Sequence, residues 1–250
     1  MSQKAEIRSN LLLNINNTLT NFWKISIPFL LLMLALRMIE IIWVFSIHQI
    51  ENDPFWTILF GIFFDLEWIF YVLGILFIFF IILYGLFPRV TSILFKLILS
   101  IFVILQAGLM FYFTKMLLPL GEDLYAYSIS DIIATVKASG ELNFINLLVI
   151  VIIFALIFFI LGLGKKIPVN LKSSILLTSG CYLYLLVFNF IPQDGIGSAS
   201  ELDRNLKVNK SFYLYNQSYN YFTVRNSMYF DFFLTSSGGN SLVDKKYVST

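Results

Sequence analysis

The stretch FWTILFGIFFDLEWIFYVLGILFIFFIILYGLF, residues 55–87, decides the fold of this chain. A helix needs about 20 apolar residues to cross about 30 Å of hydrocarbon. This stretch has 33 residues and is interrupted only by the charged side chains Asp65 and Glu67. It therefore predicts a helix that crosses a bilayer with a strong tilt, or one whose first part, up to about Glu67, lies in the outer interface.

Four further apolar stretches are each close to or above the length of a membrane span. They are Phe22–Ile47, Leu97–Leu118, Phe144–Leu163 and Ser173–Ile191. The composition agrees, since 58% of the residues are hydrophobic and 13% are charged, with a mean hydropathy of +0.82. These values exclude an ordinary soluble domain. We predict an all-α polytopic membrane protein with five spans in residues 1–191, followed by an extracytoplasmic juxtamembrane linker, residues 192–250.

Basic residues lie at alternate ends of the five stretches. They occur before or at the start of the first stretch and in the second and fourth connections: Lys4, Arg8, Lys24, Arg89, Lys96, Lys165, Lys166 and Lys172. The first connection carries Glu51 and Asp53 but no Lys or Arg. Because Lys and Arg near span ends mark the cytoplasmic side, we predict that the amino terminus is inside and that the chain after residue 191 is outside.

The third connection, Pro119–Asn143, is the longest between two stretches and is predicted to lie outside. Its candidate outer-surface residues are Asp123, Tyr125, Tyr127 and Asp131. Ser128 or Ser130 can cap a short helix that begins near Asp131, and Gly140 can end it. A short helix between two spans is expected to lie on the outer membrane surface.

Four ionisable residues fall inside the predicted spans: Arg37, Glu40, Asp65 and Glu67. Arg37 and Glu40 are three residues apart and so share a helix face. Arg37 and Asp65 are equally distant from the turn near Glu51, so they could meet at one depth. Charges in hydrocarbon are costly and normally pair or face a polar cavity. Two interpretations stay open. The functional one is a site for a substrate headgroup or a proton. The structural one is an ion pair that fixes the two helices, or outer-leaflet residues that reach the interface.

The chain offers little catalytic chemistry. It has one histidine, His48, and one cysteine, Cys181, so the residues predict neither a metal site nor a Ser-His-Asp arrangement. A net charge of +2 does not indicate a nucleic-acid partner. The sequence predicts the lipid bilayer as the partner and leaves the oligomeric state open.

Aromatic residues recur at helical intervals after the last stretch. Phe212, Tyr215, Tyr219 and Phe222 are spaced by three and four residues. Such a stripe is typical of a packing face or of a face that anchors a helix at the membrane interface.

Three segments resemble a known family. The loop PLGEDLYAYSISDIIATVKASGELNF, residues 119–144, closely resembles the loop between spans three and four of the lipoteichoic acid synthase-like sulfatases, in the versions from Bacteroidetes-type bacteria. GIFFDL, residues 61–66, is similar to that family's second-span signature. SELDRNLKVNKSFYLYNQSYNYF, residues 200–222, resembles its juxtamembrane segment.

The resemblance implies the membrane half of a phosphoglycerol transferase or sulfatase-family enzyme in a bacterial cytoplasmic membrane. In that family the spans precede an extracytoplasmic catalytic domain that uses manganese and a Thr or Ser nucleophile. No segment after residue 191 offers the carboxylates, histidines and activated nucleophile that such a domain needs, so no catalytic residue is assigned. Two alternatives remain: the membrane half of a phosphoethanolamine transferase, which the loop argues against, and a complete non-enzymatic transporter or assembly factor.

Overall fold

The computed structural model describes residues 2–48, 54–125, 130, 143–188 and 200–225. All regular elements in these residues are helical. The long helices are α1 (Ser2–Ile47), α2 (Pro54–Leu86), α3 (Pro88–Met116), α5 (Phe144–Leu163) and α6 (Leu171–Phe188). The short elements are η1 (Glu122–Tyr125), η2 (Gly164–Lys166), α7 (Glu201–Lys207), α8 (Lys210–Asn220) and the π-helical turn η3 (Tyr221–Arg225).

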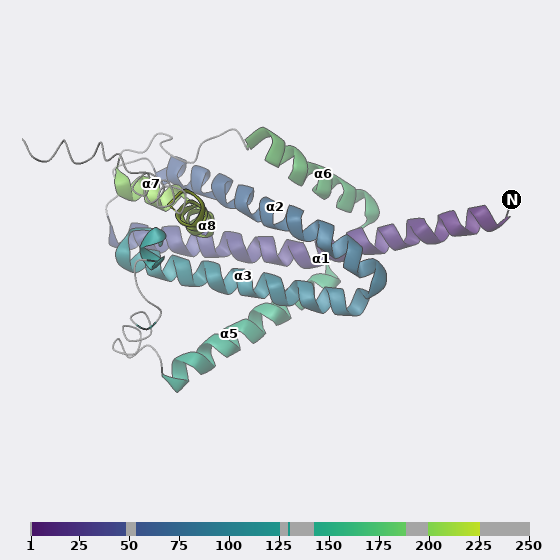
Figure 1. The fold of residues 1–250 in the computed structure, drawn as a ribbon, viewed down its shortest axis with the longest axis horizontal. Helices are drawn as coiled ribbons and strands as arrows, with labels where there is room; N and C mark the ends of the chain where they lie inside the picture. The colour runs from purple at the N-terminus through teal and green to yellow at the C-terminus, as the bar shows by residue number, and fades with distance from the viewer. Residues whose placement is uncertain (1, 49–53, 126–129, 131–142, 189–199, 226–250) are drawn as a thin grey trace, which may run out of the picture.

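Helix α1 lies at the centre of the bundle. It packs against α2, α3, α5 and α6. Helices α2 and α3 also pack against each other (Figure 1). Helices that follow one another in the chain run in opposite directions (Figure 1). Asn21 of α1 donates a hydrogen bond to the Tyr84 hydroxyl near the end of α2, whereas Arg37 meets Asp65 near the other end. Helices α1 and α2 thus form an antiparallel hairpin.

The break between α2 and α3 is one residue long. Proline is favoured at the first position of a helix because its fixed φ suits helix and its missing N–H has no partner there. Pro88 occupies that position of α3, directly after Phe87 with φ −137°. Arg89 and Lys96 were predicted to lie in the second connection, and this prediction is wrong: both lie in the first turns of α3.

The first helix also differs from the prediction. The apolar stretch begins at Phe22, but the helix begins at Ser2 and continues through Pro28. Residues 2–21, which precede the apolar stretch, are therefore helical as well. Thr18 and Thr20 donate back to the carbonyls of Asn14 and Asn16, so the hydroxyls of these two threonines are satisfied by their own helix.

Aromatic packing joins α1, α2 and α3 near the end of the bundle that holds Lys24. The Phe22 ring centroid lies 4.9 Å from that of Phe77, 5.4 Å from Phe80 and 5.1 Å from Phe95. Each aromatic pair contributes about 0.5–1.5 kcal/mol beyond the area that it buries. The core continues through Leu73, Leu99, Leu161 and Cys181, so all five long helices contribute to it.

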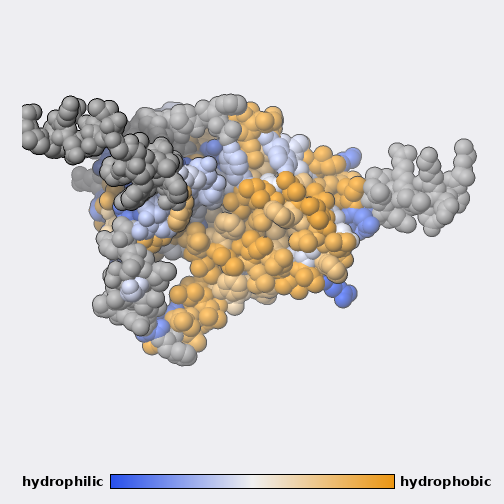
Figure 2. Space-filling view, in the orientation of Figure 1, coloured by the Kyte–Doolittle hydropathy of each residue, from blue (hydrophilic) through white to orange (hydrophobic). Residues whose placement is uncertain are grey.

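Within the described residues, four helices are long and apolar enough to cross a membrane: α1 from residue 14, α2, α3 and α5 with its continuation to Lys166. Helix α6 is apolar but shorter. Large apolar side chains face outward along these helices, among them Leu31, Ile82 and Phe159. Figure 2 shows this apolar surface over the middle of the bundle, with hydrophilic residues toward its two ends. The chain is a membrane protein.

The segment after the spans is folded onto the bundle. Helix α7 packs against α2, and α8 packs against α3 and η1. Leu206 of α7 shares a buried apolar cluster with Ile41 and Val44 of α1 and with Phe113 of α3. The predicted boundary at residue 191 lies outside the described residues, and the described part of the predicted linker, residues 200–225, packs on the bundle. The predicted interfacial helix that begins near Asp131 lies outside the described residues.

Gly164, the first residue of η2, sets how closely this end of the bundle packs. A Cβ atom on Gly164 would lie 1.8 Å from the carbonyl oxygen of Lys24, whereas a Cβ on Gly162 would meet no atom within 4 Å. Overpacking typically costs about 1–3 kcal/mol, and here the obstacle is backbone. We expect Gly164→Ala to lower the free energy of unfolding by about 3 kcal/mol or more and Gly162→Ala to leave it nearly unchanged. Thermal unfolding of both variants in detergent measures this, and equal effects would contradict the packing.

Candidate functional site

Arg37 lies at the centre of a fully buried cluster of charges in the half of the bundle away from Lys24. Its Nε donates to Asp65 Oδ2 at 2.7 Å, and its Nη2 donates to Asp65 Oδ1 at 2.5 Å. Its Nη1 donates to Glu40 Oε2 at 2.9 Å. Arg37, Glu40 and Asp65 are each 1–2% exposed. The two-pronged contact with Asp65 uses the planar fork of the guanidinium and joins α1 to α2.

The fourth member of this charge cluster comes from α8. Lys210 Nζ lies 2.8 Å from Glu40 Oε1 and 4.0 Å from the centre of the Phe113 ring, and Lys210 is 0% exposed. Helices α1 and α2 bring one cation and two anions, a net charge of −1 with Arg37, Glu40 and Asp65. Lys210 adds the second cation, so the cluster becomes neutral only when α8 is in place.

The two cations also bind the backbone at the end of α7. Lys210 Nζ donates to the carbonyl oxygens of Asn205, Leu206 and Val208 at 2.9–3.1 Å. Arg37 donates to those of Leu206 and Val208 at 2.7 and 3.3 Å. The last carbonyls of a helix have no partner within the helix and carry partial negative charge, so cations are favoured there. The cluster thus satisfies the end of α7.

The charge state of Lys210 follows from this setting. Burial lowers the pKa of its amine to about 8, and the Glu40 carboxylate opposes that change. At neutral pH the group is therefore still mostly an ammonium ion, which its contacts with a carboxylate and three carbonyls require.

Gly61 and Asn209 lie directly beside the cluster. Gly61 faces Arg37: a Cβ atom there would lie 3.7 Å from Arg37 Cδ and Nε, which is ordinary van der Waals contact. Asn209 begins α8, where its Oδ1 accepts from Phe212 N at 2.8 Å and its Nδ2 donates to Asp65 Oδ1 at 2.6 Å. One side chain thus caps α8 and joins it to the cluster.

A second buried polar group holds α7 on α2. Thr57 Oγ1 donates to Asp203 Oδ1 at 2.6 Å, and Lys207 Nζ donates to Asp203 Oδ2 at 2.7 Å. Asp203 is 0% exposed and Lys207 is 3% exposed. Ser200 begins α7 and accepts from Asp203 N. Further along, Ser211 of α8 bonds to the side-chain oxygen of Gln106 on α3.

The structure brings together three of the four charged residues predicted inside the spans. Arg37, Glu40 and Asp65 meet, as their equal distance from the turn suggested. Glu67 is also buried, but its carboxylate interacts with Tyr71 and Tyr184 instead. The geometry is that of the structural interpretation, since the four charges of the cluster are balanced by one another.

Sequence reasoning missed Lys210, Asn209 and Asp203. They were assigned to a linker because polar residues after a last span usually face water. The sequence did contain a signal for α7 and α8. Ser200 and Asn209 are residue types that favour the start of a helix, and each stands three residues before the N–H group that it caps.

The predicted outer-surface loop contributes to a polar cleft at the end of the bundle where α7 and α8 lie. The cleft has a volume of about 480 Å³ and lies between the end of α3, η1, α7 and α8. Its lining includes Asp123, Glu201, Arg204, Tyr213 and Gln217. Tyr125 packs on α8 instead, where its hydroxyl lies 2.6 Å from Ser218 Oγ. The other two predicted residues, Tyr127 and Asp131, lie outside the described residues.

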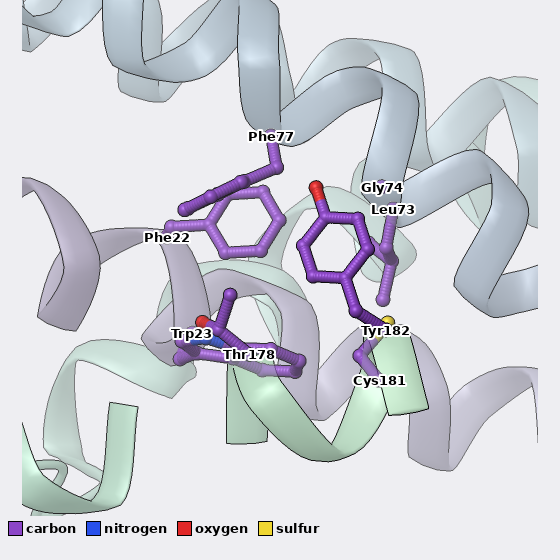
Figure 3. Close-up of a pocket in the computed structure, with 8 residues that line it drawn as sticks. All are labelled: Phe22, Trp23, Leu73, Gly74, Phe77, Thr178, Cys181 and Tyr182. Carbon is purple, nitrogen blue, oxygen red and sulfur yellow. Dashed lines mark hydrogen bonds between the residues drawn. The ribbon is translucent and has the colours of Figure 1, made fainter. Parts of the chain in front are cut away.

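A much smaller cavity lies near the other end of the bundle, between α1, α2 and α6 (Figure 3). Its volume is about 10 Å³, close to the least that holds one water molecule. Phe22, Leu73 and Phe77 contribute to its lining, and Trp23 at its edge donates to Thr178 Oγ1 at 2.8 Å. This cavity is a packing gap with room for no larger ligand.

No family model, curated protein or solved structure matches this chain. The likeness to the lipoteichoic acid synthase-like sulfatases therefore rests on the three sequence segments alone. Among the residues that the structure describes, no three His, Cys, Asp or Glu side chains gather as a metal site would need. The manganese that the likeness implies has no fitting ligands there, and no chemical step is assigned to it. The geometry by itself supports a membrane bundle that holds a folded juxtamembrane segment through buried charges.

The pairing of Arg37 with Asp65 is tested by a double-mutant cycle. Removing one partner leaves an uncompensated buried charge, which typically costs about 3–5 kcal/mol. Removing both leaves Glu40 and Lys210 as a balanced pair. We expect Arg37→Leu and Asp65→Leu each to lower the free energy of unfolding by about that amount, and the double variant to lose less than the sum. Additive losses in detergent unfolding experiments would show that the two side chains act independently.

Lys210 is predicted to hold α7 and α8 on the bundle. Lys210→Met keeps a similar length but leaves Glu40 with an unpaired charge and removes a partner from three carbonyls. We expect faster hydrogen exchange in residues 201–220 while the amides of α1–α3 stay protected. Arg204→Met is the matched control, because the Arg204 side chain is 49% exposed and its ion pair with Glu201 is long, at 3.6 Å. Equal exchange in the two variants would contradict the role of Lys210.

Proposed function

We propose that this chain is the membrane-anchoring and positioning domain of a lipoteichoic acid synthase-like phosphoglycerol transferase or sulfatase-family enzyme. Its five helices span a bacterial cytoplasmic membrane, and its juxtamembrane helices hold an extracytoplasmic catalytic domain over the outer leaflet. There the domain receives a phospholipid headgroup. The three resembling segments suggest the family, and the docking of α7 and α8 supports the positioning role.

The observation that carries the proposal is the burial of Lys210 and Asp203. A flexible tether would expose such residues to water, where each charge is solvated. Here both are 0% exposed and bound to α1 and α2. The segment that leaves the last span is thereby fixed in position and direction relative to the bundle. Anchoring alone does not need this, whereas presenting a reactive site at a defined height above the membrane does.

The proposed orientation is amino terminus inside and α7–α8 outside. Lys24, Lys165 and Lys166 lie at one end of the bundle, and the contact of η2 with α1 places them near one another. This end is the cytoplasmic side by the positive-inside rule. The charge cluster, α7 and α8 lie toward the other end (Figure 1). Helix α6, 18 residues long, is about 27 Å in length and serves as the fifth span.

A transporter would use its buried charges differently. Ions or protons move through sites whose charges face a cavity. The polar cleft at the outer end and the small cavity near Phe22 are not lined by the side chains of the charge cluster. Arg37 and Lys210 are instead held by two carboxylates and three backbone carbonyls. A cluster in which every charge is balanced supports a structural role rather than a transport site.

The positioning role is tested by a fusion. Residues 1–225 are placed ahead of the soluble catalytic domain of a lipoteichoic acid synthase-like phosphoglycerol transferase and reconstituted in phosphatidylglycerol vesicles. We expect several-fold faster glycerophosphate release than from the same domain on an unrelated single-span anchor. Fixed geometry raises the effective concentration of headgroup at the site, which a flexible anchor does less well.

Two controls make the fusion informative. The fusion that carries Lys210→Met should fall to the rate of the single-span anchor, while Arg204→Met should not. A reporter that is active only outside the cytoplasm should be active when fused after Thr223 and inactive when fused after Lys166. Equal rates with both anchors would refute the positioning role, and the reverse reporter pattern would refute the orientation.

A further inference from the structure

Helix α8 crosses the spans rather than continuing them. In Figure 1 it is seen end-on, while α1, α2 and α3 run across the picture. Its axis is therefore steeply inclined to the spans. If the spans cross a bilayer, a helix with this direction lies roughly parallel to the membrane surface. It does so at the outer end of the bundle, beside α2 and α3.

The two long edges of α8 face opposite ends of the bundle. Along one edge, Tyr213 and Gln217 approach Gly121, which lies just beyond the outer end of α3. Along the other, Phe212 and Tyr215 contact Trp68 of α2, with ring centroids 5.7 and 5.6 Å apart. Trp68 is one turn further than Asp65 toward the cytoplasmic end of α2. The edge with Phe212 and Tyr215 thus points toward the membrane interior.

Helical spacing adds Tyr219 to this inward edge, four residues after Tyr215. Both tyrosines are 56% exposed in the protein alone. The fourth residue of the predicted aromatic stripe, Phe222, does not join it. Phe222 lies in the π-helical turn η3, and its ring meets that of Tyr125 at 5.1 Å, on the side of the outer loop.

From this geometry we infer that α8 is an interfacial helix, with Tyr215 and Tyr219 inserted into the headgroup region of the outer leaflet. Tyrosine suits that depth because its ring is apolar and its hydroxyl is wet. The exposed edge is continuous with the apolar surface of the spans through Trp68. The inference rests on the proposed crossing of a bilayer by the spans, and it holds with or without a catalytic domain after α8.

The occupant of this edge is a lipid surface rather than a protein partner. The edge faces along the spans, so a soluble partner would have to enter the membrane to reach it. It also carries tyrosines without charges, as expected of side chains held at headgroup depth. Asn216 and Asn220 of α8 are exposed too, and helical spacing turns them toward the edge of Tyr213 and Gln217.

Spin labels measure this directly. In a Cys181→Ser background, Tyr215→Cys, Tyr219→Cys and Asn220→Cys are each labelled with a nitroxide and reconstituted in vesicles of phosphatidylethanolamine and phosphatidylglycerol. Asn220 is the matched control because it comes directly after Tyr219 and points about 100° further around the helix. A label on Leu183→Cys, on an exposed apolar position of α6, reports the hydrocarbon. Collisions with oxygen, which prefers lipid, are compared with collisions with a water-soluble nickel chelate.

We expect the oxygen-to-nickel ratio at Tyr215 and Tyr219 to exceed that at Asn220 several-fold, with the highest ratio at Leu183. A high ratio at Leu183 with three equal, low ratios on α8 would overturn the interfacial helix and leave the span assignment intact. A low ratio at Leu183 as well would overturn the span assignment and this inference with it. The thermal unfolding of each labelled variant, compared with the unlabelled background, confirms that the label has not displaced α8.

Discussion

The structure depends on balancing charge in a place where water cannot do so. Arg37, Glu40 and Asp65 lie on two helices that cross the apolar region, and together they carry one negative charge too many. Lys210 supplies the missing positive charge from a helix that comes after the last span. An unpaired buried charge costs several kcal/mol. Undocking α8 would remove Lys210 and leave one charge of the cluster unpaired, so this cost holds α8 on the bundle.

This constraint divides the bundle into two halves with different chemistry. Near Lys24 the helices are joined by apolar contacts, with the rings of Phe22, Phe80 and Phe95 together. Near Arg37 they are joined by ion pairs and by carbonyls at the end of α7. Moving an apolar side chain from lipid into a helix interface gains little free energy. The half of the bundle near Lys24 must therefore be stabilised by the close packing and complementary shapes of its aromatic rings. The second half gains specificity, because a charge cluster has few arrangements that satisfy every partner.

The division suits a protein whose outer end must be ordered. Helix α7 is held by Asp203 and Thr57, and α8 by Lys210, Asn209 and Ser211. These contacts fix the direction in which the chain leaves the bundle. In the proposed orientation, the aromatic edge of α8 lies where the spans meet the outer interface. Together they support the proposal that this domain sets the position of an extracytoplasmic partner domain relative to the lipid.

The sequence by itself determined the class of fold and most of the helix positions. Runs of apolar residues as long as a span leave few alternatives in a bilayer, and Pro88 marks a helix start by its own geometry. It also placed Arg37 near Asp65, because two antiparallel helices joined by a short turn align equal distances from that turn. Only the tertiary structure decided that Lys210 and the end of α7 join them, since segments as much as 171 positions apart in the chain meet there through packing that local patterns do not encode. The tertiary structure also decided that residues 200–220, which were expected to form a linker, are docked helices. Their charges are buried only when the bundle is present to pair with them.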